Sequence, residues 1–527
     1  MFSGLRRIEI LLRSALKRTE TSTMNSNLPA RSSLHARALL IAAVAFISYA
    51  YFYGGGGWNA NSRFDLVRAI LERGTLSIDA YHENTEDKVV YQGHYYSDKA
   101  PGVVLLALPA AAAAGSVLRA AGMDPTSPRG LVAISYVVTL FSVGLPTALA
   151  CSCLFLITMR LGGNVSGAAF AALGMGLATP IWAYATRFWS HALAGACLLF
   201  AFAAALRLRS SPGAQGGTLW GLAVGLAAGW ATVSEYPAAP AAAILAILAL
   251  VQVWPDGWRR RLPVAAGIAA GAIACIVVLT LYQRAAFGSA LRPSYSYYPE
   301  GAFPWMKRGY MGLTYPRIDV LLKLLLGCRR GLFFAAPVAV ASPLGLGLLW
   351  KQRSAHGAAV AATAIAAYYL LFNSSFAVWD AGWSYGPRYM AAGVPVLCIG
   401  LAPAWGSARP WGRKLLGFLA LCSVLFSLMA VSTTAQPPNQ FRCPGPQLLW
   451  PSFWAGRLSL NHISMLTRVE EANGTTHPSF NLGELAGLHG LASLIPLLMV
   501  WGIAAWLWVR MDRAATRQPA SLPSVTR

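Results

Sequence analysis

Long apolar stretches separated by short polar ones run through most of this 527-residue chain. A helix needs about 20 residues, at about 1.5 Å each, to cross the hydrocarbon core of a bilayer. Stretches of about that length fall at residues 38–55, 102–121, 131–157, 164–183, 190–206, 217–233, 238–254, 263–282, 332–350, 356–373, 389–405, 414–433 and 488–509. The pattern predicts an all-α polytopic membrane protein with about 12 transmembrane helices, in a range of roughly 11 to 13.

Composition supports this fold class and removes one functional alternative. Hydrophobic residues make up 56% of the chain and charged residues only 12%, whereas a soluble protein carries about 25% charge. The net charge of +23 first suggests nucleic-acid binding. The Lys and Arg residues, however, stand in short clusters between apolar stretches, where they set topology and face anionic lipid. We therefore expect membrane lipids, and no nucleic acid, as their partners.

The basic clusters predict which loops lie in the cytoplasm. They are the N-terminal tail, Arg207 with Arg209, Arg259–Arg261, Lys351 with Arg353, Arg409–Lys414 and Arg510–Arg517. Counting back from Arg259–Arg261 leaves Arg119 and Arg129 outside, so segment 102–121 should not cross. It begins at Pro101-Gly102 and contains Pro109, and we predict an interfacial or re-entrant helix. About twelve crossings with both termini in the cytoplasm follow, and the alternative of about thirteen reverses a set of basic loops.

This topology divides the chain into four parts. We predict a basic cytoplasmic tail (1–37), a membrane core (38–290) that includes the first outside loop (54–130), a C-terminal membrane part (291–510) and a cytoplasmic tail (511–527). The other outside loops are 283–331, 374–388 and 434–487. No internal repeat and no matching pair of interrupted helices is evident, which argues against a typical secondary transporter. Six of the eight cysteines lie in apolar stretches, and a bridge between the other two, Cys328 and Cys443, is left open.

The first outside loop concentrates the acidic residues of the chain. Of 19 Asp and Glu residues, the stretch 59–101 holds Asp65, Glu72, Asp79, Glu83, Glu86, Asp87 and Asp98. Ser62 suits the N-cap of a short amphipathic helix, Phe64–Leu71, that ends at Gly74. This places Arg63 and Asp65 near the N-terminus of that helix, where the dipole favours an anion. Val89–Tyr96 predicts a strand–turn–strand with Gly93 at the turn.

The end of this loop pairs a carboxylate with an ammonium group. Asp98 and Lys99 stand just before the helix predicted from Pro101. An ammonium group is poorly placed there for helix stability but well placed to neutralise a phosphate held at the helix N-terminus. The alternative is a solvated surface pair without function.

These motifs resemble those of a known family. Arg63-Phe64, a short helix, and then Tyr96-Ser97-Asp98-Lys99-Ala100-Pro101 look like the first periplasmic loop of GT-C glycosyltransferases. The branch is that of protein O-mannosyltransferases and lipid A aminoarabinose transferases, which resemble one another in an Arg-Tyr pair and a Tyr-x-x-Lys-Pro-Pro motif that leads into an interfacial helix. The resemblance covers about residues 38 to 290. It implies an N-terminal bundle of about seven helices and a variable C-terminal part.

One departure concerns the catalytic acid. The family carries it two or three residues before the Arg, where this chain has Asn61 and Ala60. Neither side chain can act as a base, so another carboxylate must. Asp65 is the first candidate and Asp79 the second. The alternative for both is capping or a structural salt bridge.

Later outside loops offer further candidates. Arg187 matches an Arg of the family, and His191 stands near the position of a family Asp, where it could bind a diphosphate or position the acceptor. Arg330 and Arg388, each at the start of a helix, are candidates for the carrier phosphate. The alternative for His191 and Arg388 is the aromatic belt at the membrane interface. Glu235, at the end of an apolar helix, either lines the site or marks the membrane boundary.

We therefore expect a glycosyltransferase in a bacterial-type inner membrane, with an extracytoplasmic active site. It would move a sugar from a polyprenyl-phosphate donor to a lipid, glycan or protein acceptor by inverting displacement. Asp65 or Asp79 would be the base, and Lys99 and the arginines would stabilise the departing phosphate. No cofactor is certain; the acids of the first loop could hold a divalent cation, although no spaced ligand set argues for one. The alternatives are a flippase for lipid-linked sugars and a ligase-type polymer enzyme with His191 as base.

Overall fold

The computed structural model describes residues 31–211, 213–474 and 476–517. Most of the predicted N-terminal tail (1–37) lies outside these residues, and its last seven residues belong to the first described helix, which begins at Arg31. Most of the predicted C-terminal tail also lies outside them. The described chain is a helical bundle with two small two-stranded sheets.

The longer helices match the predicted apolar stretches. They are α2 (Arg31–Ala50), α4 (Gly102–Ala120), α5 (Pro128–Thr139), α6 (Leu145–Arg160), α7 (Val165–Leu177), α9 (Ser190–Arg207), α10 (Ala214–Ser234), α11 (Ala239–Gln252), α12 (Trp258–Phe287), α15 (Ala341–Trp350), α16 (His356–Ser375), α19 (Pro410–Thr433) and α23 (Ile495–Arg517). A further span, Arg388–Ser407, contains α17 (Val394–Leu397) and α18 (Leu401–Ser407).

Short elements form the loops. They are α3 (Trp58–Arg73), α8 (Ile181–Ala185), α13 (Ile318–Leu326), α14 (Leu332–Ala335), α20 (Trp450–Trp454), α21 (Arg468–Ala472), α22 (Leu482–Leu485), β1 (Phe52–Tyr53), β2 (Lys88–Tyr91), β3 (His94–Ser97) and β4 (Phe480–Asn481). The antiparallel pair β2–β3 turns at Gln92 and Gly93, both with positive φ. This confirms the predicted hairpin, because two positive-φ residues are what a tight hairpin turn requires.

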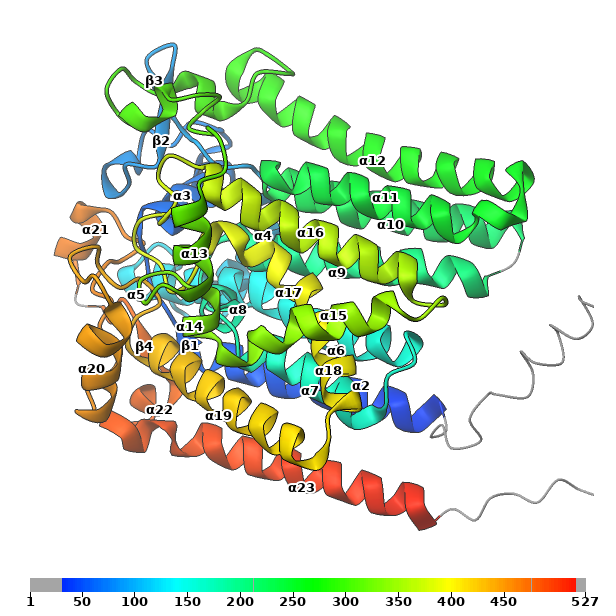
Figure 1. Cartoon of the computed structure of the whole chain (residues 1–527). Helices are drawn as coiled ribbons and strands as arrows, with labels where there is room; N and C mark the ends of the chain where they lie inside the picture. Colours follow the sequence, from blue (N-terminus) through cyan, green and yellow to red (C-terminus); the bar gives the residue numbers. More distant parts are fainter. Residues whose placement is uncertain (1–30, 212, 475, 518–527) are drawn as a thin grey trace, which may run out of the picture.

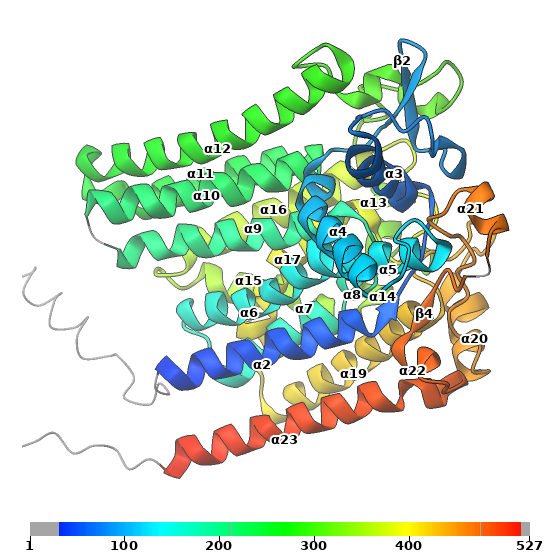
Figure 2. The ribbon, with the colours of Figure 1, turned by 180° about the vertical axis from the view of Figure 1, so that it is seen from behind.

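The all-α membrane fold is confirmed. Among the described residues, ten helices are long and apolar enough to cross a membrane, α4 among them, and three shorter apolar helices accompany them. Figure 2 shows α4 foreshortened beside α3 and α5, so its axis does not follow those of α9 to α12. This placement supports the predicted interfacial helix. With α4 set aside, the other helices would supply about twelve crossings, a count that stays a prediction.

The bundle has two different ends (Figure 1). We call the end that carries α3, β2, β3, α20, α21 and α22 the loop end. The described chain begins and finishes at the opposite end, where α2 and α23 lie together. There Arg37 pairs with Asp512 at 2.8 Å, and nearer the loop end Trp501 Nε1 donates to Ser48 Oγ at 2.9 Å. First and last helices are thus joined.

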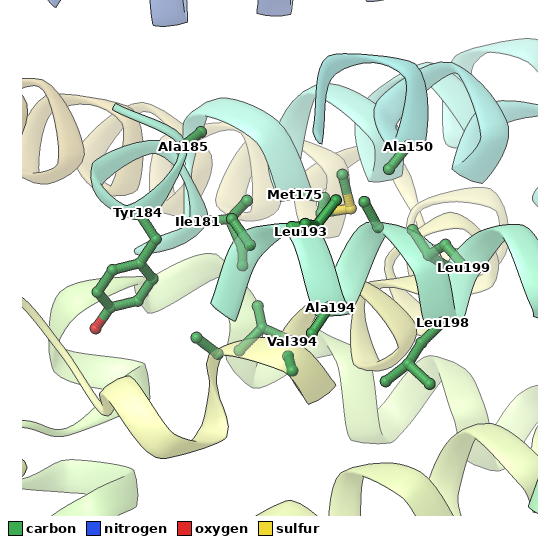
Figure 3. Packing of buried hydrophobic residues seen from close by; sticks show 14 of the residues in the cluster. Ala150, Met175, Ile181, Tyr184, Ala185, Leu193, Ala194, Leu198, Leu199 and Val394 are labelled. Atoms are coloured by element: carbon green, nitrogen blue, oxygen red, sulfur yellow. The ribbon is translucent and has the colours of Figure 1, made fainter. Parts of the chain in front are cut away.

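Small side chains bring the central helices close together. Figure 3 shows Ala150, Met175, Ile181, Leu193 and Ala194 packed between α6, α7, α8 and α9. Helix α9 is the most enclosed of the described spans, because all of its residues except Phe200, Ala203 and Arg207 are buried. Lipid tails are as apolar as the side chains, so the hydrophobic effect does not drive helices together in a membrane. Helices there associate through close packing of small residues instead. The core therefore fixes the loop-end terminus of α9, where Ser190 and His191 stand.

The first and last loops interlock at the loop end. Strand β1 pairs with β4, so that Phe52 faces Asn481 and Tyr53 faces Phe480. The glycine run that follows β1 then passes under the last loop: Asn461 Nδ2 donates to Gly54 O at 2.7 Å, and Gly55 lies against Pro478. Sequence reasoning did not use this run of four glycines, although it marks a place where backbone must approach backbone.

We expect Gly55→Ala to destabilise the protein by about 3 kcal/mol or more. Gly55 has φ +72°, and a Cβ there would lie 2.2 Å from the carbonyl oxygen of Pro478. Gly74→Ala is the matched control, because Gly74 has φ +63° but nothing within 4 Å of a built Cβ. The control should lose only about 1 kcal/mol. Thermal unfolding in detergent measures both, and equal losses would contradict the close packing of the two loops.

Candidate active site

Helix α3 carries the first part of the site. It begins at Trp58 after Gly57 and ends at Gly74, which adopts the left-handed conformation. The predicted end is confirmed, but Ser62 as N-cap is wrong, because the helix starts a full turn earlier. Ser62 instead bonds Ser97 at 2.7 Å. Arg63 is therefore not at the helix N-terminus, and its guanidinium folds back on Asn59.

A network of four residues joins α3 to the loop-end termini of α9 and α10. Arg63 Nη2 donates to Ser190 Oγ at 2.5 Å, and Ser190 Oγ in turn donates to Glu235 Oε1. His191 Nδ1 lies 3.1 Å from the same oxygen, and Arg63 Nη2 lies 3.7 Å from it. Burial would raise the pKa of Glu235, but His191 and Arg63 outweigh it and lower the pKa to about 2. Glu235 is therefore a carboxylate at neutral pH.

A second cluster surrounds Lys99. Lys99 Nζ lies 2.6 Å from Asp98 Oδ2 and 2.9 Å from Asp87 Oδ2. The hydroxyl of Tyr298 also donates to Asp98. Burial would lower the pKa of Lys99, but the two carboxylates outweigh it and raise the pKa, so the ammonium is charged. Burial raises the pKa of Asp98, against the effect of Lys99. The pair Asp98–Lys99 is thus a buried, partnered group and not a solvated one.

Tyrosines connect the two clusters. The Tyr295 ring stacks on Tyr298, with centroids 6.1 Å apart, and meets Tyr236 edge-on at 5.8 Å. Burial raises the pKa of Tyr295, and the charges of Asp98 and Glu235 raise it further. Tyr295 therefore lies between the carboxylates of both clusters. We name the whole assembly the loop-end cluster: Arg63, Asp87, Asp98, Lys99, Ser190, His191, Glu235, Tyr295 and Tyr298.

Two predicted phosphate ligands hold backbone instead. Arg187 donates through both terminal nitrogens to Gly54 O and Gly56 O, and burial lowers its pKa to about 9. Arg330 donates to Asp380 O at 2.8 Å and to Gly382 O. Both guanidinium groups therefore fasten one loop to another. Arg388 is different, because its guanidinium lies over the Trp189 ring at 5.1 Å, near His191.

Neither predicted base faces the loop-end cluster. Asp79 accepts bonds from Ser77 Oγ, His94 Nδ1 and the Tyr95 backbone, and its side chain is 41% exposed. Asp65 is fully buried in α3, and the charges that act on it are Arg68, Glu470 and Lys88. Their roles as bases stay predictions without support from this geometry.

Asp65→Asn is expected to keep sugar transfer within about threefold of wild type. Burial raises the Asp65 pKa, and its Oδ2 has no described partner. For an acid whose folded pKa is raised, stability is present below the unfolded pKa of about 4 and declines as pH rises toward the folded pKa. The amide removes that decline, so thermal stability at pH 7 should equal or exceed that of wild type. Loss of transfer with an unchanged melting temperature would make Asp65 the base.

Neither a set of metal ligands nor the apolar groove described here coincides with this cluster. Within the described ranges, no group of three or more His, Cys, Asp or Glu side chains is close enough to hold a metal ion. A groove of about 510 Å³ lies between α6, α9, α10 and α12 and is lined mainly by Ala, Leu, Phe, Trp and Cys side chains. An apolar groove cannot supply acid–base chemistry, so we place the site by its charges.

Comparisons with known proteins address the fold. No known protein family and no curated protein sequence matches this chain. ArnT from Cupriavidus metallidurans bound to undecaprenyl phosphate has a similar structure, with a TM-score of 0.51 and 16% identity over 92% of this chain and 77% of that one. The apo structure of the same ArnT has a TM-score of 0.48 and 17% identity, over 91% of this chain and 75% of that one. A third similar structure is the archaeal oligosaccharyltransferase AglB from Archaeoglobus fulgidus, in complex with an inhibitory peptide and a dolichol-phosphate. It has a TM-score of 0.44 and 11% identity, over 78% of this chain and 56% of that one. The likeness to ArnT confirms the expected GT-C fold.

Proposed function

We propose that this protein is a membrane glycosyltransferase that moves a sugar from a polyprenyl-phosphate donor to an extracytoplasmic acceptor. The observation that carries the proposal is the loop-end cluster, in which Lys99 and Arg63 stand beside carboxylates at one end of an apolar bundle. ArnT, whose fold is similar, is bound to undecaprenyl phosphate in its structure. A donor of that kind would keep its chain in the bilayer and its phosphate at the cluster.

The disulfide supports an extracytoplasmic site. Cys328 and Cys443 form a bridge between two loops predicted to lie outside. Disulfides persist in oxidising compartments and are rare in the cytosol. Helix α12, whose first turn contains Arg259–Arg261, begins at the opposite end of the bundle, as expected of a cytoplasmic loop. An inner-membrane protein with its loop end outside satisfies both conditions.

The cluster supports direct displacement at the anomeric carbon. The acceptor oxygen bonds to that carbon while the bond from carbon to phosphate oxygen breaks, and the electron pair stays on the polyprenyl phosphate. Lys99 and Arg63 stabilise the charge that develops on the departing phosphate. Asp87 is the displaceable partner of Lys99, because it is 16% exposed while Asp98 is fully buried. A donor phosphate would take the place of Asp87 beside the ammonium group.

A flippase for lipid-linked sugars is the second candidate. It would need charged groups along a path through the membrane. Helices α10 and α16 contain no Asp, Glu, Lys or Arg, and the charged residues of α9 and α12 stand within about one turn of a helix end. The charges gather instead at the loop end, which favours the transferase.

Membranes that contain the protein should incorporate label from one class of polyprenyl-phosphate sugar into an endogenous acceptor. Control membranes without the protein should not. The donor panel should cover hexoses, pentoses and aminopentoses, because the sequence and the fold do not select among them. Absence of incorporation across the panel, with the protein present and folded, would contradict the proposed function.

A further inference from the structure

We infer that Glu235 is the general base that accepts the proton of the acceptor hydroxyl, and that His191 positions it. This inference rests on the proposed function. The carboxylate comes from the loop between α10 and α11, not from the first loop, where sequence reasoning placed the base. Glu235 would thus fill the role for which Asn61 and Ala60 are unsuited.

One oxygen of Glu235 is held from three sides. Oε1 faces Ser190 Oγ, His191 Nδ1 and Arg63 Nη2, which come from the start of α9 and from α3. The backbone is fixed as well, because Glu235 N donates to Ala231 O at 2.8 Å and Pro237 follows in the next turn. A side chain anchored at one oxygen has a defined direction for the other, which is what proton transfer requires.

The other oxygen is free to accept a proton. No described hydrogen-bond donor reaches Glu235 Oε2, and the side chain is 16% exposed. Asp98 differs, since Ser62 donates to its Oδ1 at 3.4 Å while Lys99 and Tyr298 hold its Oδ2. Asp87 has an exposed edge too, but its partner is the cation proposed to receive the phosphate. Glu235 is therefore the carboxylate of the loop-end cluster best arranged as a base.

The proton balance is complete with this assignment. As the acceptor oxygen bonds to the anomeric carbon, its proton passes to Glu235 Oε2. The bond between the anomeric carbon and the phosphate oxygen breaks, and polyprenyl phosphate leaves with the electron pair. Glu235 then gives the proton to water, which its lowered pKa of about 2 favours. No second acid is needed, because a phosphate monoester is a good leaving group.

The decisive comparison uses variants of one cluster in liposomes that contain the purified full-length protein. Glu235→Gln should lower kcat by about 10²- to 10⁴-fold with the donor KM within about threefold of wild type. Asp87→Asn should change mainly the KM for the donor and leave kcat closer to that of wild type. Glu235→Asp, which keeps a carboxylate but withdraws it by one methylene, should retain part of kcat. An unchanged kcat in Glu235→Gln, while Lys99→Ala loses transfer, would overturn the inference and leave the proposed function standing.

His191→Gln tests the positioning role. The charged and titratable groups that face Glu235 are Arg63 from α3, His191 from α9, Tyr236 and Tyr295 from neighbouring loops, and Tyr369 from α16. Without His191 the Glu235 pKa should rise, so the acid limb of the kcat–pH profile should move to higher pH and kcat should fall by about tenfold.

A larger kcat loss in His191→Gln than in Glu235→Gln would make His191 the base and overturn the inference. If Glu235→Gln does not fold, an unchanged kcat in Glu235→Asp would overturn it. Absence of transfer in wild type would instead refute the proposed function.

Discussion

Lys99→Ala is expected to lower kcat for sugar transfer by about 10²- to 10³-fold, or roughly 3 to 4 kcal/mol of transition-state stabilisation. Lys99 is the one residue of the cluster that pairs with both Asp87 and Asp98 at hydrogen-bond distance. A buried ammonium group aimed at a developing phosphate charge acts where no water screens it. The measurement is single-turnover transfer from a labelled polyprenyl-phosphate sugar.

Two controls separate this effect from damage to the loop. Lys88→Ala removes another lysine of the first loop, whose side chain pairs with Glu86 at 3.8 Å and His82 O at 2.9 Å, neither of which belongs to the loop-end cluster. It should keep transfer near wild type. Lys99→Arg keeps the charge and should recover part of the rate. Equal losses in Lys88→Ala and Lys99→Ala would mean that the first loop matters only for folding.

Arg68→Ala is expected to destabilise the protein by about 2 to 3 kcal/mol, because it leaves two carboxylates without their partner in a half-buried site. The guanidinium donates to Glu72 Oε1 at 2.8 Å on α3 and to Glu470 Oε1 at 2.6 Å in the last loop. Glu470 also closes a capping box with Thr467 at the start of α21. Loss of Arg68 should therefore release α21 from α3, which thermal unfolding and protease cleavage near Glu470 both report.

The same contact predicts a dependence on pH. Burial would raise the pKa of Glu470, but hydrogen bonds from Arg68 and Thr467 outweigh it and lower the pKa. A lowered folded pKa gives stability that is present above the unfolded value of about 4 and lost as pH falls through the folded pKa. Lys323→Ala is the control for Arg68→Ala, since the pair of Lys323 with Asp319 is exposed and its loss should leave the stability almost unchanged. Equal losses in the two variants would contradict the docking role of Arg68.

The sequence was sufficient for the fold because lipid restricts what apolar segments can do. Backbone groups inside a bilayer must bond within their own helix, so hydropathy alone predicts the spans. The hairpin was also predictable, since Gln92 and Gly93 meet a local rule for turns. The start of α3 was not predictable in this way. Ser62 has a side chain that could cap a helix, but its hydroxyl bonds Ser97 in the folded protein instead.

The site was less accessible to sequence reasoning, because its members meet only in space. Arg63 and Glu235 belong to different loops, and no local pattern shows that both reach Ser190. Arg187 was predicted to bind phosphate, but it donates to the backbone oxygens Gly54 O and Gly56 O. Backbone partners cannot be identified from side-chain motifs, so the sequence did not indicate them. The signal that was present is Glu235 itself, a lone carboxylate at the end of an apolar helix that must find partners.

Sugar transfer is tested most directly by counting both products in liposomes that contain the purified protein and a doubly labelled polyprenyl-phosphate sugar. We predict that wild type releases one polyprenyl phosphate for each sugar transferred, and that Lys99→Ala does neither at a comparable rate. Movement of the intact lipid-linked sugar between leaflets, without release of polyprenyl phosphate, would contradict this prediction and make the protein a flippase.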